Sequence, residues 1–117
     1  MQTGYFVISG KNCFEPVNTY IKEDYKVDYE KPLLDGMLYG AEDYSFLTNS
    51  NLMVVITVEK VDNSNDECEI EIIAGGGGSG IFSITAGTEE RRVVKFYNKI
   101  VDFCNTNGYE ISKLEEQ

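Results

Sequence analysis

Histidine is absent from this sequence of 117 residues. Because imidazole is the commonest zinc ligand and the commonest general base near neutral pH, its absence removes Ser-His-Asp and Cys-His triads. Acid–base chemistry would have to come from carboxylates, tyrosines or lysines, and no pair of these has a spacing that forces the side chains together. We therefore expect no catalytic residue, no metal site and no cofactor, and favour a protein that is not an enzyme.

Cysteine is scarce, with one residue at each of positions 13, 68 and 104. An odd number of cysteines at wide spacing, without a C-x-x-C pair, fits neither a disulfide framework nor a zinc site. Each cysteine belongs to an apolar pattern, as Cys68 does with Ile70 and Ile72. We expect three buried structural thiols.

Long apolar runs are also missing, since no stretch approaches 18 uninterrupted apolar residues. No transmembrane helix is therefore expected. The N-terminal segment has no basic region, and its apolar run from Tyr5 to Ile8 is too short for a signal peptide. A cytoplasmic location is the expectation that follows.

Positive charge is in deficit, with ten Lys and Arg against twenty Asp and Glu and a net charge of −10. A chain of this charge repels phosphate backbones and anionic lipids, so we expect neither nucleic-acid nor membrane binding. Arg91, Arg92 and Lys95 form a basic cluster, but two acidic residues precede it directly. That cluster is typical of the solvated face of a helix.

The size and composition of the chain indicate one globular domain over residues 1–117. Hydrophobic residues make up 42% and charged residues 26%, as in ordinary folded proteins. A chain of this length supports a single core and is too short for two.

The first two thirds of the sequence predict mainly strands. Residues 4–9 predict a strand, and Asn12-x-x-Glu15 resembles a capping pair before a short helix that ends near Asp24. Further predicted elements are an exposed connection over 23–31, a strand over 36–47 with a possible bulge at Gly40, a central strand over 52–61 and a half-buried strand over 67–74.

The last third of the sequence predicts a long helix. Thr88 is a suitable N-cap, apolar residues then recur at helical spacing, and Gly108 follows the helix as a left-handed C-cap. Residues 109–114 predict a short edge strand. The fold class expected is α+β: a mostly antiparallel sheet of about four to six strands, with a short N-terminal helix and a long C-terminal helix packed on one face.

The turn over 62–66 places oxygen-bearing side chains at alternate positions, as a calcium loop does. An EF-hand also requires glycine at its sixth position and a bidentate acid at its twelfth, where this chain has Glu67 and Ile73. We interpret the turn as an acidic hairpin, with calcium or magnesium binding as a lesser alternative.

The glycine-rich run after residue 74 satisfies G-x-G-x-x-G and follows a predicted strand. The next residues alternate like another strand, where a dinucleotide fold requires a helix, and no Lys-Ser/Thr follows as in a P-loop. The glycines therefore indicate a turn or a close backbone approach, with an anion cradle at the helix start as the alternative. The residues of that alternative site are Gly75, Gly76, Gly77, Gly78, Ser79, Gly80, Thr88 and Arg91.

Three stretches carry a resemblance to small proteins of a domain-of-unknown-function family from Gram-positive bacteria. They are residues 53–58, residues 73–82 with the glycine run, and the segment Ala86-Gly-Thr-Glu-Glu90. The resemblance covers roughly the C-terminal half of the chain. It implies a bacterial protein and a shared fold unit, and it implies no substrate.

Two functions remain as expectations. The first is a non-catalytic binding or protein-interaction module that uses the free face of the sheet or the glycine segment, which the eight tyrosines and six phenylalanines favour. In this case an exposed edge at 36–47 is expected to pair with a second copy in a homodimer. The alternative is a small-ligand or anion-binding domain, which includes an enzyme, built on Gly75–Gly80.

Overall fold

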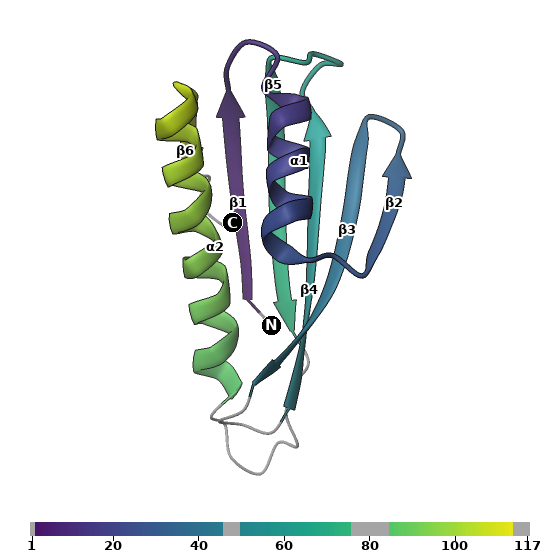
Figure 1. Cartoon of the computed structure of the whole chain (residues 1–117), viewed down its shortest axis with the longest axis vertical. Helices are drawn as coiled ribbons and strands as arrows, with labels where there is room; N and C mark the ends of the chain where they lie inside the picture. Colours follow the sequence, from purple (N-terminus) through teal and green to yellow (C-terminus); the bar gives the residue numbers. More distant parts are fainter. Residues whose placement is uncertain (1, 46–49, 76–84, 114–117) are drawn as a thin grey trace.

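The computed structural model describes residues 2–45, 50–75 and 85–113 and shows six strands and two helices (Figure 1). In chain order they are β1 (Gln2–Ser9), α1 (Phe14–Tyr25), β2 (Tyr29–Leu33), β3 (Gly36–Ser45), β4 (Ser50–Lys60), β5 (Glu67–Gly75), α2 (Thr85–Asn107) and β6 (Glu110–Lys113). The predicted α+β class is confirmed, and so are the short first helix and the long second helix.

All six strands belong to one antiparallel sheet in the order β2-β3-β4-β5-β1-β6. Strands β2 to β5 follow one another as hairpins, whereas β1 lies between β5 and β6, far from both in sequence. Strand β4 is flanked by β3 and β5, which confirms its predicted central place. The turn between β4 and β5 holds Asp62 and Asn63 at φ values of 50° and 61°, the left-handed conformation that Asx residues tolerate in tight hairpins.

Both helices lie on the same face of the sheet and run in opposite directions (Figure 1). Alternate strand residues point toward them, as in β5, where every second side chain from Cys68 to Ala74 is buried. The largest fully buried side chains of this core come from every layer: Phe6, Ile8, Ile21, Tyr39, Ile56, Ile70, Ile72, Phe96 and Ile100. Burial of this apolar surface is the main driving force for folding.

One hydrogen-bond chain crosses the core between α1 and β3. Tyr39, only 1% exposed, donates from Oη to Oδ1 of Asn18 at 2.6 Å. The Asn18 side chain, 6% exposed, donates from Nδ2 to the carbonyl of Phe14 at 2.7 Å. The chain satisfies polar groups that would otherwise be costly to bury.

The three cysteines are buried and free, as predicted. Desolvation raises the pKa of Cys104 to about 11, and burial also raises the pKa of the Cys13 and Cys68 thiols. These groups are therefore protonated and unreactive near neutral pH. Among the described residues, no helix combines the length and apolar character needed to cross a membrane.

Several local predictions were wrong at the helix starts. Helix α2 already begins at Thr85, so Thr88 is its fourth residue and not its N-cap, because Ala86 favours the helix and a single glycine is tolerated. The N-cap of α1 is Cys13 without a side-chain cap. Asn12 is instead left-handed at φ 54°, and its N–H donates to Oδ1 of Asp66 at 2.7 Å.

The sheet edge was also placed wrongly. Residues 29–33 form the edge strand β2, in a segment that the sequence had suggested as a connection. Residues 36–40 are therefore covered on both sides, by β2 and β4, whereas residues 41–45 pair with β4 alone among the described strands. The expected free edge is thus confined to that second part of β3. Gly40 forms regular pairs with Tyr29 and Val55 and marks no bulge.

Candidate functional site: the open face of the sheet

The face of the sheet opposite the helices is uncovered by any described element. We call it the open face and define it by its partly exposed side chains: Tyr5, Val7, Tyr29, Leu38, Met53, Val55, Thr57, Glu59, Glu69, Glu71 and Ile73. The strand register aligns these residues in rows, because directly paired residues in an antiparallel sheet point to the same side. The surface therefore joins residues from five strands.

One end of the open face is apolar. Met53 is 47% exposed and Tyr29 is 56% exposed, and both are large side chains with no covering element in the described part of the chain. With Leu38 and Val55 they line a hollow of about 610 Å³, which Asp28 and Glu42 also border. An uncovered apolar surface of this kind, bordered by polar residues, marks a binding surface in many proteins.

Gly40 shapes this hollow. An added Cβ at Gly40 would lie 3.6 Å from Cβ of Tyr29, its cross-strand partner. The tyrosine side chain therefore covers the glycine, and the absence of a side chain at Gly40 leaves the sheet surface low at this point.

The other end of the open face is acidic. Glu59 and Glu69 are directly opposite each other on β4 and β5, and Glu71 follows in the next row of the same face. Like charges at directly opposite positions destabilise a sheet. Glu67 and Glu110 extend the acidic surface, since both pair with Ser9, on either side of it.

Tyr5 organises the centre of the acidic end. Its Oη donates a hydrogen bond to Oε2 of Glu69 at 2.7 Å across the β1–β5 pair. This hydrogen bond, with partial burial and the nearby charges of Glu71 and Glu59, raises the pKa of Tyr5 to about 12. Tyr5 therefore remains a neutral donor that fixes the Glu69 carboxylate at physiological pH.

The residues of the predicted anion cradle are only partly within the described residues. Gly75 ends β5 and pairs with Met53, at the apolar end of the open face. Gly76, Gly77, Gly78, Ser79 and Gly80 lie outside the described residues, as does the predicted strand 81–84. Arg91 is exposed on α2, three residues after Thr88, and lines a shallow hollow with Val94 and Lys95. None of the described contacts brings Arg91 to Gly75.

The acidic turn between β4 and β5 has a structural use. Oδ1 of Asp66 accepts the N–H of Asn12, and Oγ of Ser64 accepts the N–H of Asp66 at 3.0 Å. Within the described ranges, no group of three or more Cys, Asp and Glu side chains is arranged to hold a metal ion. The turn therefore ties the end of β1 to the sheet.

The sequence did not single out the apolar residues of the open face. Strand β4 is apolar on both sides, a pattern that by itself predicts only a central position in the sheet. In a sheet with helices on one face alone, the second apolar side remains exposed, as at Met53. The apolar character of both sides of β4 was therefore the feature of the sequence that could have indicated an exposed apolar surface.

Comparisons of the chain with protein-family models, with curated proteins and with solved structures found no match.

Proposed function

We propose that this protein is a non-catalytic interaction module whose open face binds a basic, partly apolar segment of another protein. The observation that carries this proposal is the pairing of Glu59 with Glu69 on the same face of the sheet as an exposed apolar hollow. A like-charge pair across two strands destabilises the free sheet, and a cationic partner would relieve that repulsion. Local rules of folding are most often violated at functional surfaces.

The charge of the open face favours a heterologous partner over a second copy. Two copies joined through this face would bring two sets of carboxylates together, in chains that each carry a net charge of −10. Edge pairing through β2 is also disfavoured, because Lys31 and Pro32 occupy that strand. Charged residues and proline on an edge strand oppose pairing with another sheet.

The partner should combine lysine or arginine with aliphatic side chains. Positive groups would pair with Glu59, Glu69 and Glu71, while apolar groups would enter the hollow beside Tyr29 and Met53. An extended segment with basic residues in one half and apolar residues in the other would meet both ends. The resemblance to small bacterial proteins supports a bacterial protein as the setting of this interaction, and a cytoplasmic location is proposed with it.

A defined peptide pair tests the proposal. The probe is a ten-residue peptide with five lysines followed by five valines, and its control has glutamate in place of lysine. Titration into isotopically labelled protein should shift the amide resonances of the open face, with Val55 and Glu71 as reporters, and only the lysine peptide should bind. Binding should weaken above 0.1 M salt, where the screening length falls below about 10 Å.

A matched pair of variants locates the binding surface. Met53→Ser should weaken binding about five-fold, because it removes roughly 1 kcal/mol of apolar contact. Val94→Ser is the control, since Val94 is 49% exposed against 47% for Met53 and lies on α2. Resonance shifts confined to the helices, equal effects of both substitutions, or equal binding of the glutamate peptide would contradict the proposal.

A further inference from the structure

A cavity on the helical side of the sheet is lined by charged residues. Its volume is about 400 Å³, and it lies where the C-terminal end of α1 meets α2 above β3 and β4. We call it the basic cavity and define it by Asp24, Tyr25, Lys26, Asp28, Ala41, Glu42, Val54, Arg92, Lys95 and Lys99. It opens on the helical side of the sheet, and at β3 it adjoins the hollow of the open face, with which it shares Asp28, Ala41 and Glu42.

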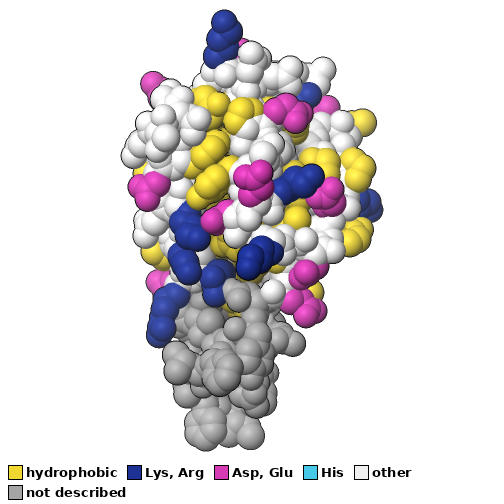
Figure 2. Space-filling view, in the orientation of Figure 1, with side chains coloured by type: hydrophobic (Ala, Val, Ile, Leu, Met, Phe, Trp, Pro, Cys, Tyr) yellow, Lys and Arg dark blue, Asp and Glu magenta, His cyan; other side chains and the backbone are white. Residues whose placement is uncertain are grey.

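The basic cavity concentrates positive charge in an acidic protein. Four of the ten basic residues line it, together with three carboxylates, for a net charge of +1 where the whole chain has −10. Figure 2 shows lysine and arginine side chains gathered beside α2 on this face. The cavity therefore attracts an anion that the rest of the surface repels.

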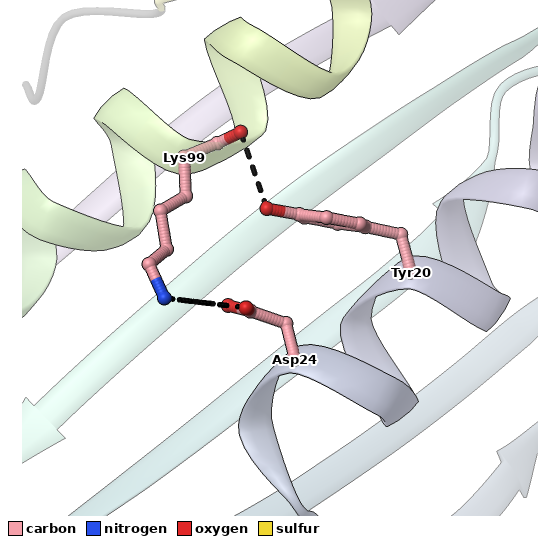
Figure 3. Close-up of polar contacts among 3 residues, drawn as sticks. All are labelled: Tyr20, Asp24 and Lys99. Atoms are coloured by element: carbon pink, nitrogen blue, oxygen red, sulfur yellow. Dashed lines mark hydrogen bonds and ion pairs between the residues drawn. The ribbon is translucent and has the colours of Figure 1, made fainter.

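One of these cations is held in place by contacts between the two helices. Nζ of Lys99 lies 3.2 Å and 3.4 Å from the two carboxylate oxygens of Asp24 (Figure 3). Tyr20 donates from Oη to the carbonyl of Lys99 at 3.3 Å, and its ring stacks on Phe103 with centroids 4.4 Å apart. Because these contacts join α1 to α2 beside the cavity, the Lys99 ammonium is positioned before any ligand arrives.

The remaining lining is suited to a ligand that has more than one kind of group. Lys26 and Lys95 are exposed and Arg92 is half-buried, so their donors reach the cavity from two elements. Asp28 accepts the N–H of Glu42 at 3.1 Å through Oδ2, and a carboxylate has further acceptor sites that suit hydroxyl groups. Val54 and Ala41, both buried, supply an apolar floor.

We propose that the basic cavity binds a phosphate monoester of a small polyhydroxylated molecule, a sugar phosphate in the simplest case. The phosphate pairs with Arg92, Lys95 and Lys26, because a guanidinium and ammonium groups donate charge-assisted hydrogen bonds to phosphate oxygens. The hydroxyl groups donate to Asp28. A volume of 400 Å³ is within the range of small-molecule sites. This proposal does not depend on the function proposed for the open face.

Calorimetric titration with three probes tests the inference. Ribose 5-phosphate should bind, inorganic phosphate should bind at least ten-fold more weakly because it lacks the sugar hydroxyls, and ribose should not bind measurably. Lys95→Gln should weaken ribose 5-phosphate binding about ten-fold. Lys31→Gln is the matched control, because it makes the same change of charge at an exposed lysine on β2, outside the cavity.

The outcomes distinguish a specific binding site from nonspecific attraction of an anion by net charge. Equal weakening by Lys95→Gln and Lys31→Gln would overturn the proposal, since only net charge would then matter. Equal binding of inorganic phosphate and ribose 5-phosphate would overturn the role of the hydroxyl groups. Absence of binding at 10 mM ribose 5-phosphate, with the wild-type protein shown to be folded by circular dichroism, would overturn the site itself.

Discussion

Replacing Tyr39 by phenylalanine removes one hydroxyl from the middle of the core. The Tyr39 hydroxyl donates to Oδ1 of Asn18 at 2.6 Å, and both residues are buried. Asn18 belongs to α1 and Tyr39 to β3, so the hydrogen bond fixes the short helix on the sheet. The substitution keeps the ring and its packing, and it leaves the amide oxygen of Asn18 without that donor.

The cost follows from the burial of the acceptor. A hydrogen bond contributes about 0.5–1.5 kcal/mol net, but a buried polar group left without its partner costs about 1–3 kcal/mol. Because Asn18 is only 6% exposed, water does not replace the hydroxyl without rearrangement of the core. We expect Tyr39→Phe to lower the free energy of unfolding by about 2 kcal/mol, and the melting temperature by roughly 6–10 °C for a domain of this size.

Urea unfolding followed by far-ultraviolet circular dichroism measures the effect. Tyr29→Phe is the control, because it makes the same chemical change at a side chain that is 56% exposed, and it should stay within about 0.5 kcal/mol of the wild type. Asn18→Leu combined with Tyr39→Phe completes a double-mutant cycle. The double variant should lose less stability than the two single losses added together, by about 1 kcal/mol or more.

A stability change below about 0.3 kcal/mol for Tyr39→Phe would refute this reasoning, because the acceptor would then be satisfied in some other way. Strict additivity in the cycle would show in the same way that the two side chains are not coupled.

Three further predictions follow from burial and backbone geometry. The three cysteines should not react with a disulfide reagent at pH 8 in the native protein and should all react in urea, because burial raises their pKa values; rapid native labelling would contradict this. In an ultraviolet titration Tyr5 should ionise near pH 12. Because its folded pKa lies above the ordinary 10.0, its stabilising contribution is complete below pH 10 and is lost between pH 10 and 12. If the absorbance change near pH 12 were unchanged in Tyr5→Phe, the assignment to Tyr5 would be excluded. Gly36→Ala should cost at least about 2 kcal/mol in urea unfolding, because the new Cβ would lie too close to the carbonyl oxygen of Val58, and a neutral result would show that the strand shifts freely.

The sequence predicted those parts of the fold in which a local pattern determines the structure. The alternation over 67–74 fixes which side of β5 is buried, and the helical spacing after residue 88 fixes the buried stripe of α2. The edge strand β2 was missed because Lys31 and Pro32, which suit an edge, are equally common in loops. The pairing of β1 with β5 and β6 has no local signal, since its partners are more than fifty residues away.

The two surfaces were harder to predict than the fold. The sequence anticipated a free sheet face, but Tyr29, Leu38 and Met53 become neighbours only through the register of three strands. The cluster of Arg91, Arg92 and Lys95 predicted only the solvated face of a helix. The packing of α1 beside α2 adds Asp24 and Lys26, and Asp28 and the β3 residues Ala41 and Glu42 complete the cavity.

The position of β1 between β5 and β6 also affects how the chain folds while it is being synthesised. Strand β1 is synthesised first, yet 57 residues separate Ser9 from Glu67, the first residue of its earlier partner. At about 5–20 residues per second, the ribosome needs roughly three to eleven seconds to add them. During that interval the Tyr-Phe-Val-Ile segment over 5–8 has no partner strand to join, so its apolar side chains stay open to aggregation.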